Sequence, residues 1–304
     1  MSNFKRRDFL KLGTGLLGGF AIGAMACNNN ADNKSPGADT TGKAGPGAAA
    51  LAAFGLQLYT LRDDFPKDPK GVLKQVAGMG YTQVEGYEGP QGIFWGMSNT
   101  DFKKYTDELG ISMVSSHCDI SKDFEKKAAE AAAIGMQYLM CPWKGPQKSI
   151  DDFKRFADEF NAKGEICKKA GLRFAYHNHD YSFKTIDGQL PQEVMMANTD
   201  PALVDFEMDI YWVVTAGADP EAWLKKYPNR FRSCHIKDRS KTPVADEGKN
   251  SCDLGTGTID FAKILKTARD NGMQYYIVEQ EAYPNGTPLE AVKVDAAYMK
   301  ALKF

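Results

Sequence analysis

The chain has 304 residues, of which 43% are hydrophobic and 25% charged, and its formal net charge at pH 7 is −1. That length fits one large α/β domain with appendages. The near-neutral charge gives no reason to expect nucleic acid as a partner, because proteins that bind phosphate backbones concentrate Lys and Arg. Six cysteines without a CxxC pair disfavour a disulfide scaffold and a cysteine zinc site.

The first 27 residues are typical of a targeting segment. Residues 5–11 (KRRDFLK) resemble a twin-arginine export signal, and an apolar stretch rich in Gly and Ala follows them. Residues 24–27 (AMAC) form a loose lipobox, in which Cys27 would carry a lipid. Residues 28–50 are polar and small, which predicts a disordered linker. We expect an exported, periplasmic protein whose link to a membrane would be a lipid at Cys27, with its folded domain over residues 51–304.

From residue 54 onward, apolar strand-like runs alternate with amphipathic helical ones. The predicted strands are 54–61, 82–87, 111–118, 136–142, 172–179, 204–209, 231–238 and 274–280. Helices are predicted at 69–79, 121–134, 151–170 and 259–271, and another should open at Asp219-Pro220. Strands that alternate with single helices specify parallel βαβ units, and eight such units predict a single-domain (β/α)₈ TIM barrel. No GxGxxG follows the first strand, which removes the main support for a dinucleotide-binding fold.

The histidines of the chain share one position, the C-terminal end of a predicted strand. They are His117, His177, His179 and His235. Three acidic residues end other strands in the same way, namely Glu85, Asp209 and Glu279. In a barrel the C-terminal ends of the strands meet at one rim, and that rim carries the active site. The pattern therefore predicts a metal-dependent enzyme.

Candidate metal ligands come from the last four predicted strands. In chain order they are His177, Asp209, His235 and Glu279. Residues two apart point to the same side of a strand, so His179 is expected to face the barrel axis with His177. One of the two sixth-strand carboxylates is expected to cap the next helix, and Glu207 is the candidate for that role. A set of imidazoles and carboxylates without a thiolate suits one Mn²⁺, Co²⁺, Zn²⁺, Fe²⁺ or Mg²⁺ ion and does not choose among them.

Several motifs, in the right order over residues 54 to about 300, resemble the sugar phosphate isomerase/epimerase family, the xylose isomerase-like branch of the TIM barrels. The motifs are residues 57–62 (QLYTLR), 176–179 (YHNH), Asp209 with Trp212, 216–220 (AGADP), 235–238 (HIKD) and 278–280 (VEQ). The members closest in character are exported 3-keto-glycoside lyases or hydratases and inosose dehydratases.

The resemblance implies a ligand set. In that family one divalent ion is held by residues from the fifth to the eighth strand, commonly Glu, Asp, His and Glu. Asp209, His235 and Glu279 match the last three. The first position is histidine here; His177 aligns best with the usual glutamate, and His179 is the alternative. Because that glutamate often serves as the base in epimerases, its replacement argues against a simple two-base epimerase.

The resemblance also implies chemistry next to a sugar carbonyl. The ion would polarise the carbonyl, a base would remove the neighbouring proton, and the ion would stabilise the enediolate. Candidate catalytic residues are His179, His117 and Glu85 as bases, and Lys237 to hold the substrate or the developing oxyanion. Candidate substrate-binding residues, several of them aromatic rings that could stack on a pyranose, are Tyr59, Trp95, Trp143, Trp212 and Asp238.

Three outcomes share that chemistry: epimerisation, isomerisation and elimination. An exported enzyme would rarely meet phosphorylated sugars, so the expected partner is an unphosphorylated sugar or keto-glycoside. Elimination or hydration of a 3-keto-glycoside is therefore the first choice, and epimerisation or isomerisation of a keto-sugar is the alternative. A hydrolase like the AP endonucleases of the same barrel, or a non-catalytic sugar-binding lipoprotein, fits the residues less well.

Overall fold

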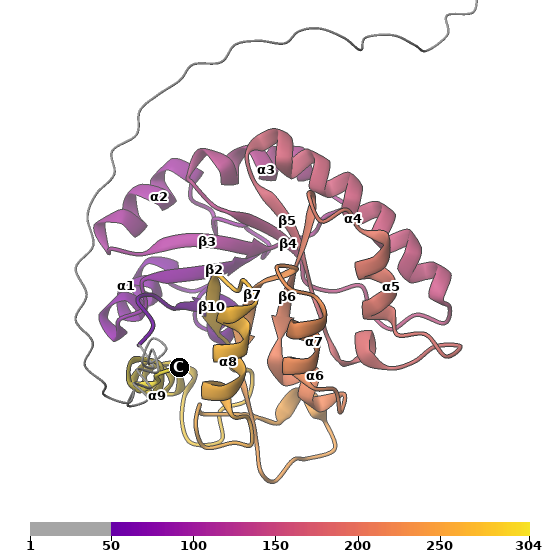
Figure 1. The fold of residues 1–304 in the computed structure, drawn as a ribbon. Coiled ribbons are helices and arrows are strands. Elements are labelled where there is room, and N and C mark those ends of the chain that lie inside the picture. The colour runs from indigo at the N-terminus through magenta and orange to yellow at the C-terminus, as the bar shows by residue number, and fades with distance from the viewer. Residues whose placement is uncertain (1–49) are drawn as a thin grey trace, which may run out of the picture. The chain divides into compact units, whose positions relative to one another are not determined.

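Parallel strands close into a barrel at the centre of the described chain (Figure 1). The computed structural model describes residues 50–304; the predicted signal segment 1–27 with Cys27, and the linker as far as residue 49, lie outside the described residues. The barrel strands follow chain order: β1 Gly55–Gln57, β2 Gln83–Tyr87, β3 Ser112–His117, β4 Tyr138–Cys141, β5 Arg173–His177, β6 Val204–Asp209, β7 Phe231–Ile236 and β10 Tyr275–Val278. Because β1 pairs with both β2 and β10, the sheet closes on itself, and the predicted TIM barrel is confirmed.

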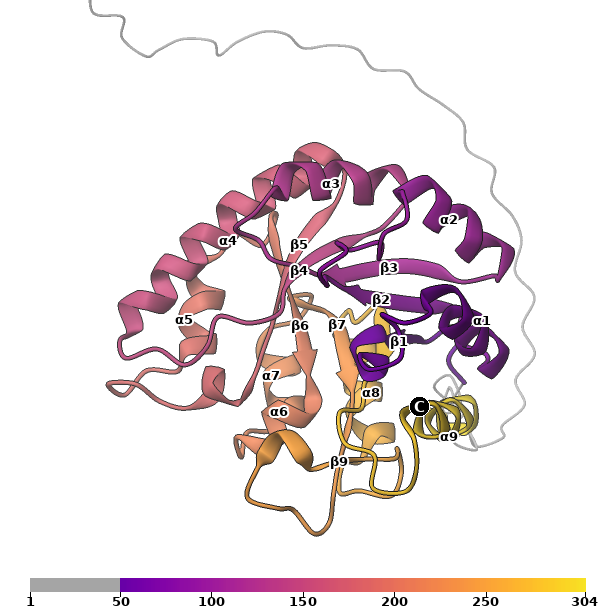
Figure 2. The same ribbon diagram turned by 180° about the vertical axis from the view of Figure 1, so that it is seen from behind.

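Helices surround the barrel, as the two opposite views show (Figures 1 and 2). They are α1 Pro69–Met79, α2 Asn99–Glu108, α3 Phe124–Ala133, α4 Ile150–Ala170, α5 Pro191–Asn198, α6 Ile210–Thr215, α7 Pro220–Lys226, α8 Phe261–Asp270 and α9 Pro288–Ala301. The predicted helix 69–79 matches α1, which the Asp68 side chain caps through Gly71 N. Helices α1 and α4 end at Gly80 and Gly171, whose positive φ angles of 97° and 89° suit glycine.

The first strand is shorter than predicted. β1 ends at Gln57, and residues Leu58–Leu61 form a 3₁₀ helix, η1, instead of the last part of a strand. The Gln57 side chain accepts a hydrogen bond from Tyr59 N at 3.0 Å, which stabilises the first turn of η1. The apolar run Leu58 to Leu61 is buried all the same, except for Tyr59, so hydrophobicity alone could not place the boundary.

A short excursion separates β7 from α8. There, β8 (Asp238–Arg239) and β9 (Ser251–Cys252) pair antiparallel outside the barrel. Within residues 50–304 no helix is both long enough and apolar enough to cross a membrane.

Helix α9 buries an acidic side chain, Asp295, whose relative exposure is 0%. Its Oδ1 accepts a hydrogen bond from Leu254 N at 2.8 Å, whereas its Oδ2 has no hydrogen-bond partner among the described residues. Burial raises the pKa of this carboxyl group from 3.8 to about 8, and the negative charges of Asp253 and Asp238 add to the shift. Asp295 is therefore mostly neutral in the folded protein at pH 7.

Replacing Asp295 with asparagine should flatten the dependence of stability on pH. The unfolded carboxyl group loses its proton near 3.8 and the folded one near 8, so the free energy of unfolding falls as pH rises between these values. The slope is at most about 1.4 kcal/mol per pH unit. Asparagine keeps the oxygen that accepts from Leu254 N and has no proton to lose. Urea unfolding at about pH 5 and about pH 7.5 should show that the free energy of unfolding of the variant, relative to that of the wild type, is higher at pH 7.5 than at pH 5. The same difference at both pH values would contradict the raised pKa of Asp295.

Candidate active site

The C-terminal ends of the barrel strands bring most of the predicted site residues together. Strand β3 ends at His117, β5 ends at His177, and β6 ends at Asp209, while Glu279 directly follows β10. Strand register sets neighbours beside each other: His177 lies opposite Glu207, and Asp209 lies opposite His235. The side chains are buried, so their polar atoms must find partners within the protein.

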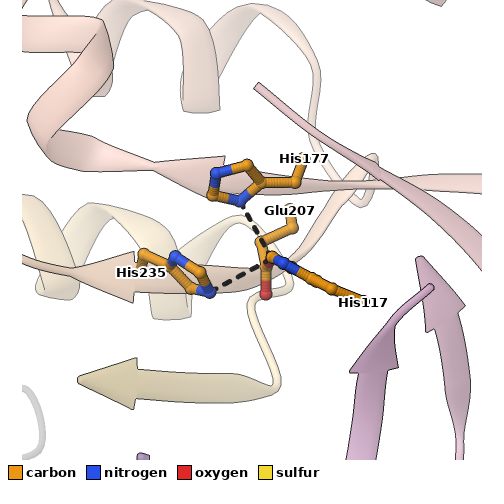
Figure 3. A group of neighbouring side chains, drawn as sticks. All are labelled: His117, His177, Glu207 and His235. Carbon is orange, nitrogen blue, oxygen red and sulfur yellow. Dashed lines mark hydrogen bonds and ion pairs between the residues drawn. The ribbon is translucent and has the colours of Figure 1, made fainter. Parts of the chain in front are cut away.

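One buried group consists of His117, His177, Glu207 and His235, whose ligand atoms lie within 4.8 Å of one another. Figure 3 shows the three imidazoles gathered around the Glu207 carboxylate. Glu207 Oε2 lies 2.8 Å from His117 Nε2, 3.1 Å from His177 Nδ1 and 3.2 Å from His235 Nε2. We call these four residues the three-histidine group. Its imidazole and carboxylate donors suit a divalent metal ion.

Glu85 lies next to the three-histidine group and is completely buried. Its Oε1 accepts a hydrogen bond from Gln57 Nε2 at 2.8 Å and lies 2.7 Å from His235 Nε2. Its Oε2 accepts from Ser115 Oγ at 2.5 Å. The sequence predicted Glu85 as a catalytic base; the structure encloses it among these donors and does not place it among the residues that line the pocket.

A second group consists of Asp209, His235 and Glu279, and again its ligand atoms lie within 4.8 Å of one another. His235 Nδ1 lies 3.0 Å from Glu279 Oε2 and 3.7 Å from Asp209 Oδ2. The remaining predicted ligand adjoins this group, since His177 Nε2 lies 3.8 Å from Asp209 Oδ2. We call the three residues with His177 the carboxylate group. Two donors that each bind one ion at about 2.1 Å lie at most about 4.2 Å apart, and these three distances satisfy that limit.

Asp209 has two roles that the sequence assigned to different residues. Its Oδ1 accepts from Trp212 N at 3.0 Å, so Asp209 is the N-cap of α6. Glu207 points into the three-histidine group instead, and the expectation that Glu207 caps the helix was wrong. Asp209 Oδ2 is buried and accepts no hydrogen bond within the described chain, although Lys237 Nζ approaches it to 2.9 Å. That oxygen therefore has one cationic neighbour, the Lys237 ammonium, and accepts no hydrogen bond of good geometry from the described residues.

Lys237 places its ammonium among carboxylates. Its Nζ lies 2.9 Å from Asp209 Oδ2, 2.9 Å from Glu279 Oε2 and 2.8 Å from Glu281 Oε1. It also lies 5.0 Å and 5.2 Å from the ring centres of Tyr211 and Trp212. Burial opposes the charge, but Asp209 and Glu279 outweigh it and hold the pKa of Lys237 well above its ordinary value. Lys237 is thus a permanent buried cation in the metal-free protein.

The same charges act on the other groups. Burial opposes ionisation of Glu279, yet Lys237 and then His235 hold its pKa well below the ordinary value. His235 and His117 do the same for the pKa of Glu207 against the effect of burial. Burial, with the charge of His235, lowers the pKa of His177. The carboxylates are accordingly ionised and His177 is neutral, which are the states that bind metal ions. Burial opposes protonation of His235, but Glu207 and Glu279 outweigh it and hold its pKa well above the ordinary value, so His235 would release a proton when an ion binds.

A pocket of about 360 Å³ opens beside both groups. Its lining residues are Tyr59, Tyr87, Glu88, His117, Cys118, Asp119, Pro142, Trp143, His177, His179, Glu279 and Glu281. Among the described residues, no lysine or arginine lines it. Trp143 is 53% exposed, and its ring is held edge-on by His179 and Tyr181, with ring centres 4.5 Å and 5.0 Å away. The pocket thus combines a rigid aromatic wall with carboxylates and imidazoles.

His179 follows β5 and precedes a short 3₁₀ helix, η2 (Asp180–Phe183). Its ring stacks on Tyr181 and lies 5.3 Å from the ring of Trp212. Burial, together with the nearby charge of Lys237, holds the pKa of His179 well below its ordinary value. Trp212, predicted to bind substrate, packs between His179 and Lys237 and does not itself line the pocket.

Trp95 and Asp238, also predicted to bind substrate, are buried and do not line the pocket. The Trp95 ring lies over Gly89, where a Cβ atom would come within 2.2 Å of it, and its Nε1 donates to Tyr87 O at 3.0 Å. The Asp238 carboxylate accepts hydrogen bonds from the backbone of the loop before α8. Their donors are the N–H groups of Gly255, Gly257 and Ile259 at 2.9, 2.9 and 3.2 Å. Both side chains therefore organise loops.

Sequence reasoning missed Glu207 as a member of the buried cluster, and it missed Glu88, Asp119 and Glu281 as pocket residues. Glu207 had a usable signal: it stands two residues before Asp209, so the alternation that pairs His177 with His179 also pairs these two carboxylates. The other three lie one to three residues after the ends of β2, β3 and β10, in loops whose paths the sequence pattern does not specify.

Comparisons with known proteins agree with this architecture. The model of the family described as "Xylose isomerase-like TIM barrel" matches residues 73–302. A solved sugar phosphate isomerase/epimerase from Parabacteroides distasonis is 32% identical, with a TM-score of 0.70 over 88% of this chain and 98% of that one. A solved IOLI protein with a bound zinc atom has a TM-score of 0.67 over 82% of this chain and 97% of that one; at 14% identity it shows the fold alone.

Among curated proteins, inosose dehydratase of Clostridium perfringens is 29% identical over 164 residues, which are 49% of this chain and 54% of that one. The chain thus spans about half the length of the curated relatives it matches. The closed barrel, the buried histidine–carboxylate cluster and the extent of the family match lead to one conclusion. The chain belongs to the xylose isomerase-like TIM barrel family, which includes sugar isomerases, epimerases and dehydratases.

Proposed function

We propose that this protein is a divalent-metal-dependent enzyme that removes the proton next to a sugar carbonyl. The reaction that fits best is elimination from, or hydration of, a 3-keto-glycoside; epimerisation or isomerisation of a free keto-sugar is the alternative. The observation that carries the proposal is Asp209 Oδ2, which is buried, accepts no hydrogen bond from the described residues and lies near three further ligand atoms beside an aromatic-walled pocket. An export signal, if residues 1–27 act as one, would keep the enzyme away from phosphorylated sugars.

The carboxylate group fits an ion by charge and by distance. His177 Nε2, Asp209 Oδ2, His235 Nδ1 and Glu279 Oε2 would hold it, and the donors do not choose among Mn²⁺, Co²⁺, Zn²⁺, Fe²⁺ and Mg²⁺. A divalent ion held there would act as a Lewis acid on a carbonyl and acidify the neighbouring C–H.

His117 is the base that the geometry favours. It lines the pocket, and its Nε2 lies 2.8 Å from Glu207 Oε2. Its Nδ1 has no hydrogen-bond partner among the described residues, so the atom is available to take a proton if Nε2 donates to Glu207. Burial opposes protonation of His117, but Glu85 and Glu207 outweigh it and raise its pKa. The two carboxylates would stabilise the imidazolium that forms when His117 takes a proton.

Lys237 would stabilise the negative charge that develops on the substrate oxygen. Its ammonium is fixed between Asp209, Glu279 and Glu281, and Glu281 lines the pocket. Lys237 is buried and does not itself line the pocket, so a hydrogen bond from it to a developing oxyanion would require its ammonium to move away from one of these carboxylates. A single base suffices for elimination, whereas inversion needs a proton carrier on each face. Because Lys237 stays protonated, it is not a second base, and His117 as the one base favours elimination.

The pocket lining supports an uncharged substrate. Glu88, Asp119, Glu279 and Glu281 line it, and a phosphorylated sugar would meet their negative charge without a lysine or arginine from the described lining. The exposed face of Trp143 suits the apolar face of a sugar ring.

Proton NMR in D₂O tests the proposal directly. Metal-loaded protein should consume 3-keto-glycosides, release the alcohol of the glycoside and exchange deuterium at the carbon next to the carbonyl. Deuterium exchange in free keto-sugars with intact keto-glycosides would instead establish the epimerase or isomerase alternative. No exchange with either class, from protein that holds its metal, would exclude proton abstraction next to a carbonyl in these substrates.

Alanine at Trp143 should weaken substrate binding and leave the fold intact. Loss of one aromatic–sugar contact worth about 1 kcal/mol should raise KM roughly 5-fold, with kcat little changed. Because Trp143 is about half exposed, the melting temperature should change little. Steady-state kinetics of Trp143→Ala beside Trp143→Phe, which keeps an aromatic face, provide the check; equal KM values in all three proteins would remove Trp143 from the binding site.

A further inference from the structure

The rings of His177 and His235 each connect the two groups defined above. His235 directs Nδ1 toward Glu279, at 3.0 Å, and Nε2 toward Glu85, at 2.7 Å. His177 directs Nδ1 toward Glu207, at 3.1 Å, and Nε2 toward Asp209 Oδ2, at 3.8 Å. A neutral imidazole carries one N–H and one lone pair, so the partner of one nitrogen decides what the other nitrogen can do.

The carboxylates of Glu207 and Glu85 both have hydrogen-bond partners on each of their oxygens. Glu207 Oε1 accepts from Ser233 Oγ at 2.8 Å, and its Oε2 lies within hydrogen-bond distance of His117 and His177. Both oxygens of Glu85 also have partners, which are Gln57 and His235 on Oε1 and Ser115 on Oε2. These four oxygens need no ion to satisfy them.

The carboxylate group differs in this respect. Asp209 Oδ2 is buried, accepts no hydrogen bond from the described residues, and faces His177 Nε2 and His235 Nδ1. The two groups therefore differ at one atom. Asp209 Oδ2 accepts no such hydrogen bond, although the Lys237 ammonium lies 2.9 Å away, whereas Glu279 Oε2 accepts from Lys237 and the oxygens of Glu207 and Glu85 all have hydrogen-bond partners.

We propose that Glu207 and Glu85 are positioning residues for the ion site and that the three-histidine group is not itself an ion site. Glu207 takes the N–H of His177 Nδ1, and Glu85 takes the N–H of His235 Nε2. Each carboxylate thereby fixes the tautomer that presents a lone pair, on His177 Nε2 and His235 Nδ1, toward Asp209 and Glu279. This inference rests on the metal site of the proposed function, and it identifies two residues that would raise the affinity of that site for a divalent ion.

Glutamine at either position keeps the size of the side chain and one acceptor oxygen but removes the charge. A carboxamide N–H turned toward His177 Nδ1 would force the opposite tautomer, with an N–H on Nε2 where an ion needs a lone pair. Loss of such a supporting carboxylate costs roughly 10–100-fold in metal affinity. Glu207→Gln and Glu85→Gln should each weaken Zn²⁺ and Co²⁺ binding by that factor while the stoichiometry stays at one ion per chain.

Competition with a chromophoric chelator on the full chain measures the affinity, and mass spectrometry measures the stoichiometry. Asp295→Asn is the matched control, because it removes a buried carboxyl group from α9 and should leave the affinity unchanged. The visible spectrum of the Co²⁺-loaded variants should also change, since rotated imidazoles alter the ligand field.

Three results would overturn the inference. Unchanged affinity in both glutamine variants, whatever their melting temperatures, would leave Glu207 and Glu85 with a merely structural role. Loss of all binding in Glu207→Gln, with one ion retained in Asp209→Asn, would place the ion in the three-histidine group. If the wild-type chain binds neither Zn²⁺ nor Co²⁺, the proposed function fails together with this inference. The first two results differ from this one, because in both of them the wild type still binds an ion.

Discussion

Asparagine at Asp209 should leave the protein folded and unable to hold a divalent ion. The Oδ1 atom that caps α6 remains in the variant, whereas an amide nitrogen replaces the buried Oδ2 that we assign to the ion. An amide nitrogen has no lone pair to offer a cation, so the loss of affinity should exceed the roughly 10–100-fold expected for a supporting residue. Proton abstraction should be lost with the ion.

Metal content by mass spectrometry checks this expectation, with Asp246→Asn as the control. Asp246 is an exposed carboxylate that caps a surface turn, so its loss should change neither metal content nor turnover. In Asp209→Asn, Lys237 keeps Glu279 and Glu281 as partners, which is why no unpaired buried charge should destabilise the fold. An Asp209→Asn protein that purifies with one tightly held ion would contradict the assignment of the carboxylate group.

Glutamine at His117 should lower kcat by roughly 10²–10⁴-fold, the usual contribution of a general base. Glutamine retains an N–H donor that can reach Glu207, but it has no nitrogen lone pair with which to take a proton. Metal affinity should change by less than in Glu207→Gln, because His117 is not one of the four proposed ligands. The rate of deuterium exchange into substrate, measured beside metal content, separates the loss of a base from the loss of the ion.

The matched variant is His179→Gln. His179 also lines the pocket, but its pKa lies well below the ordinary value and no carboxylate of residues 50–304 hydrogen-bonds to it. Its replacement should therefore affect exchange less than His117→Gln does. A larger loss of exchange in His179→Gln than in His117→Gln would assign the role of base to His179, which is also one of the three bases that the sequence predicted.

Much of the fold could be read from the chain because local physics sets it. Asp68 caps the start of α1, and Gly80 ends it with a positive φ angle. Such capping residues and the apolar runs between them mark the limits of a helix or strand without contacts to distant residues. The convergence of the histidines was also predictable, because closing a parallel barrel brings the C-terminal ends of its strands together whatever their sequence.

The remaining errors concern contacts between segments distant in the chain. Trp95 is buried because Gly89 leaves space for its ring, and that fit depends on the path of one loop. Glu207 joins the histidines because His117, which stands 90 residues earlier in the chain, lies opposite it across the barrel. Asp209 both caps α6 and faces the carboxylate group, whereas sequence rules give one role to each residue.

The loop between β9 and α8 follows the seventh barrel strand, a region where many TIM barrels bind phosphate. Here the amides of Gly255, Gly257 and Ile259 already enclose an anion, the carboxylate of Asp238. This internal ligand is covalently tethered, so its effective concentration far exceeds that of any free metabolite. A phosphate bound by the same amides would have to displace the Asp238 carboxylate and break its hydrogen bonds to this loop. The amides of the loop, engaged on folding by a carboxylate of the same chain, are therefore not free donors for a phosphate ester.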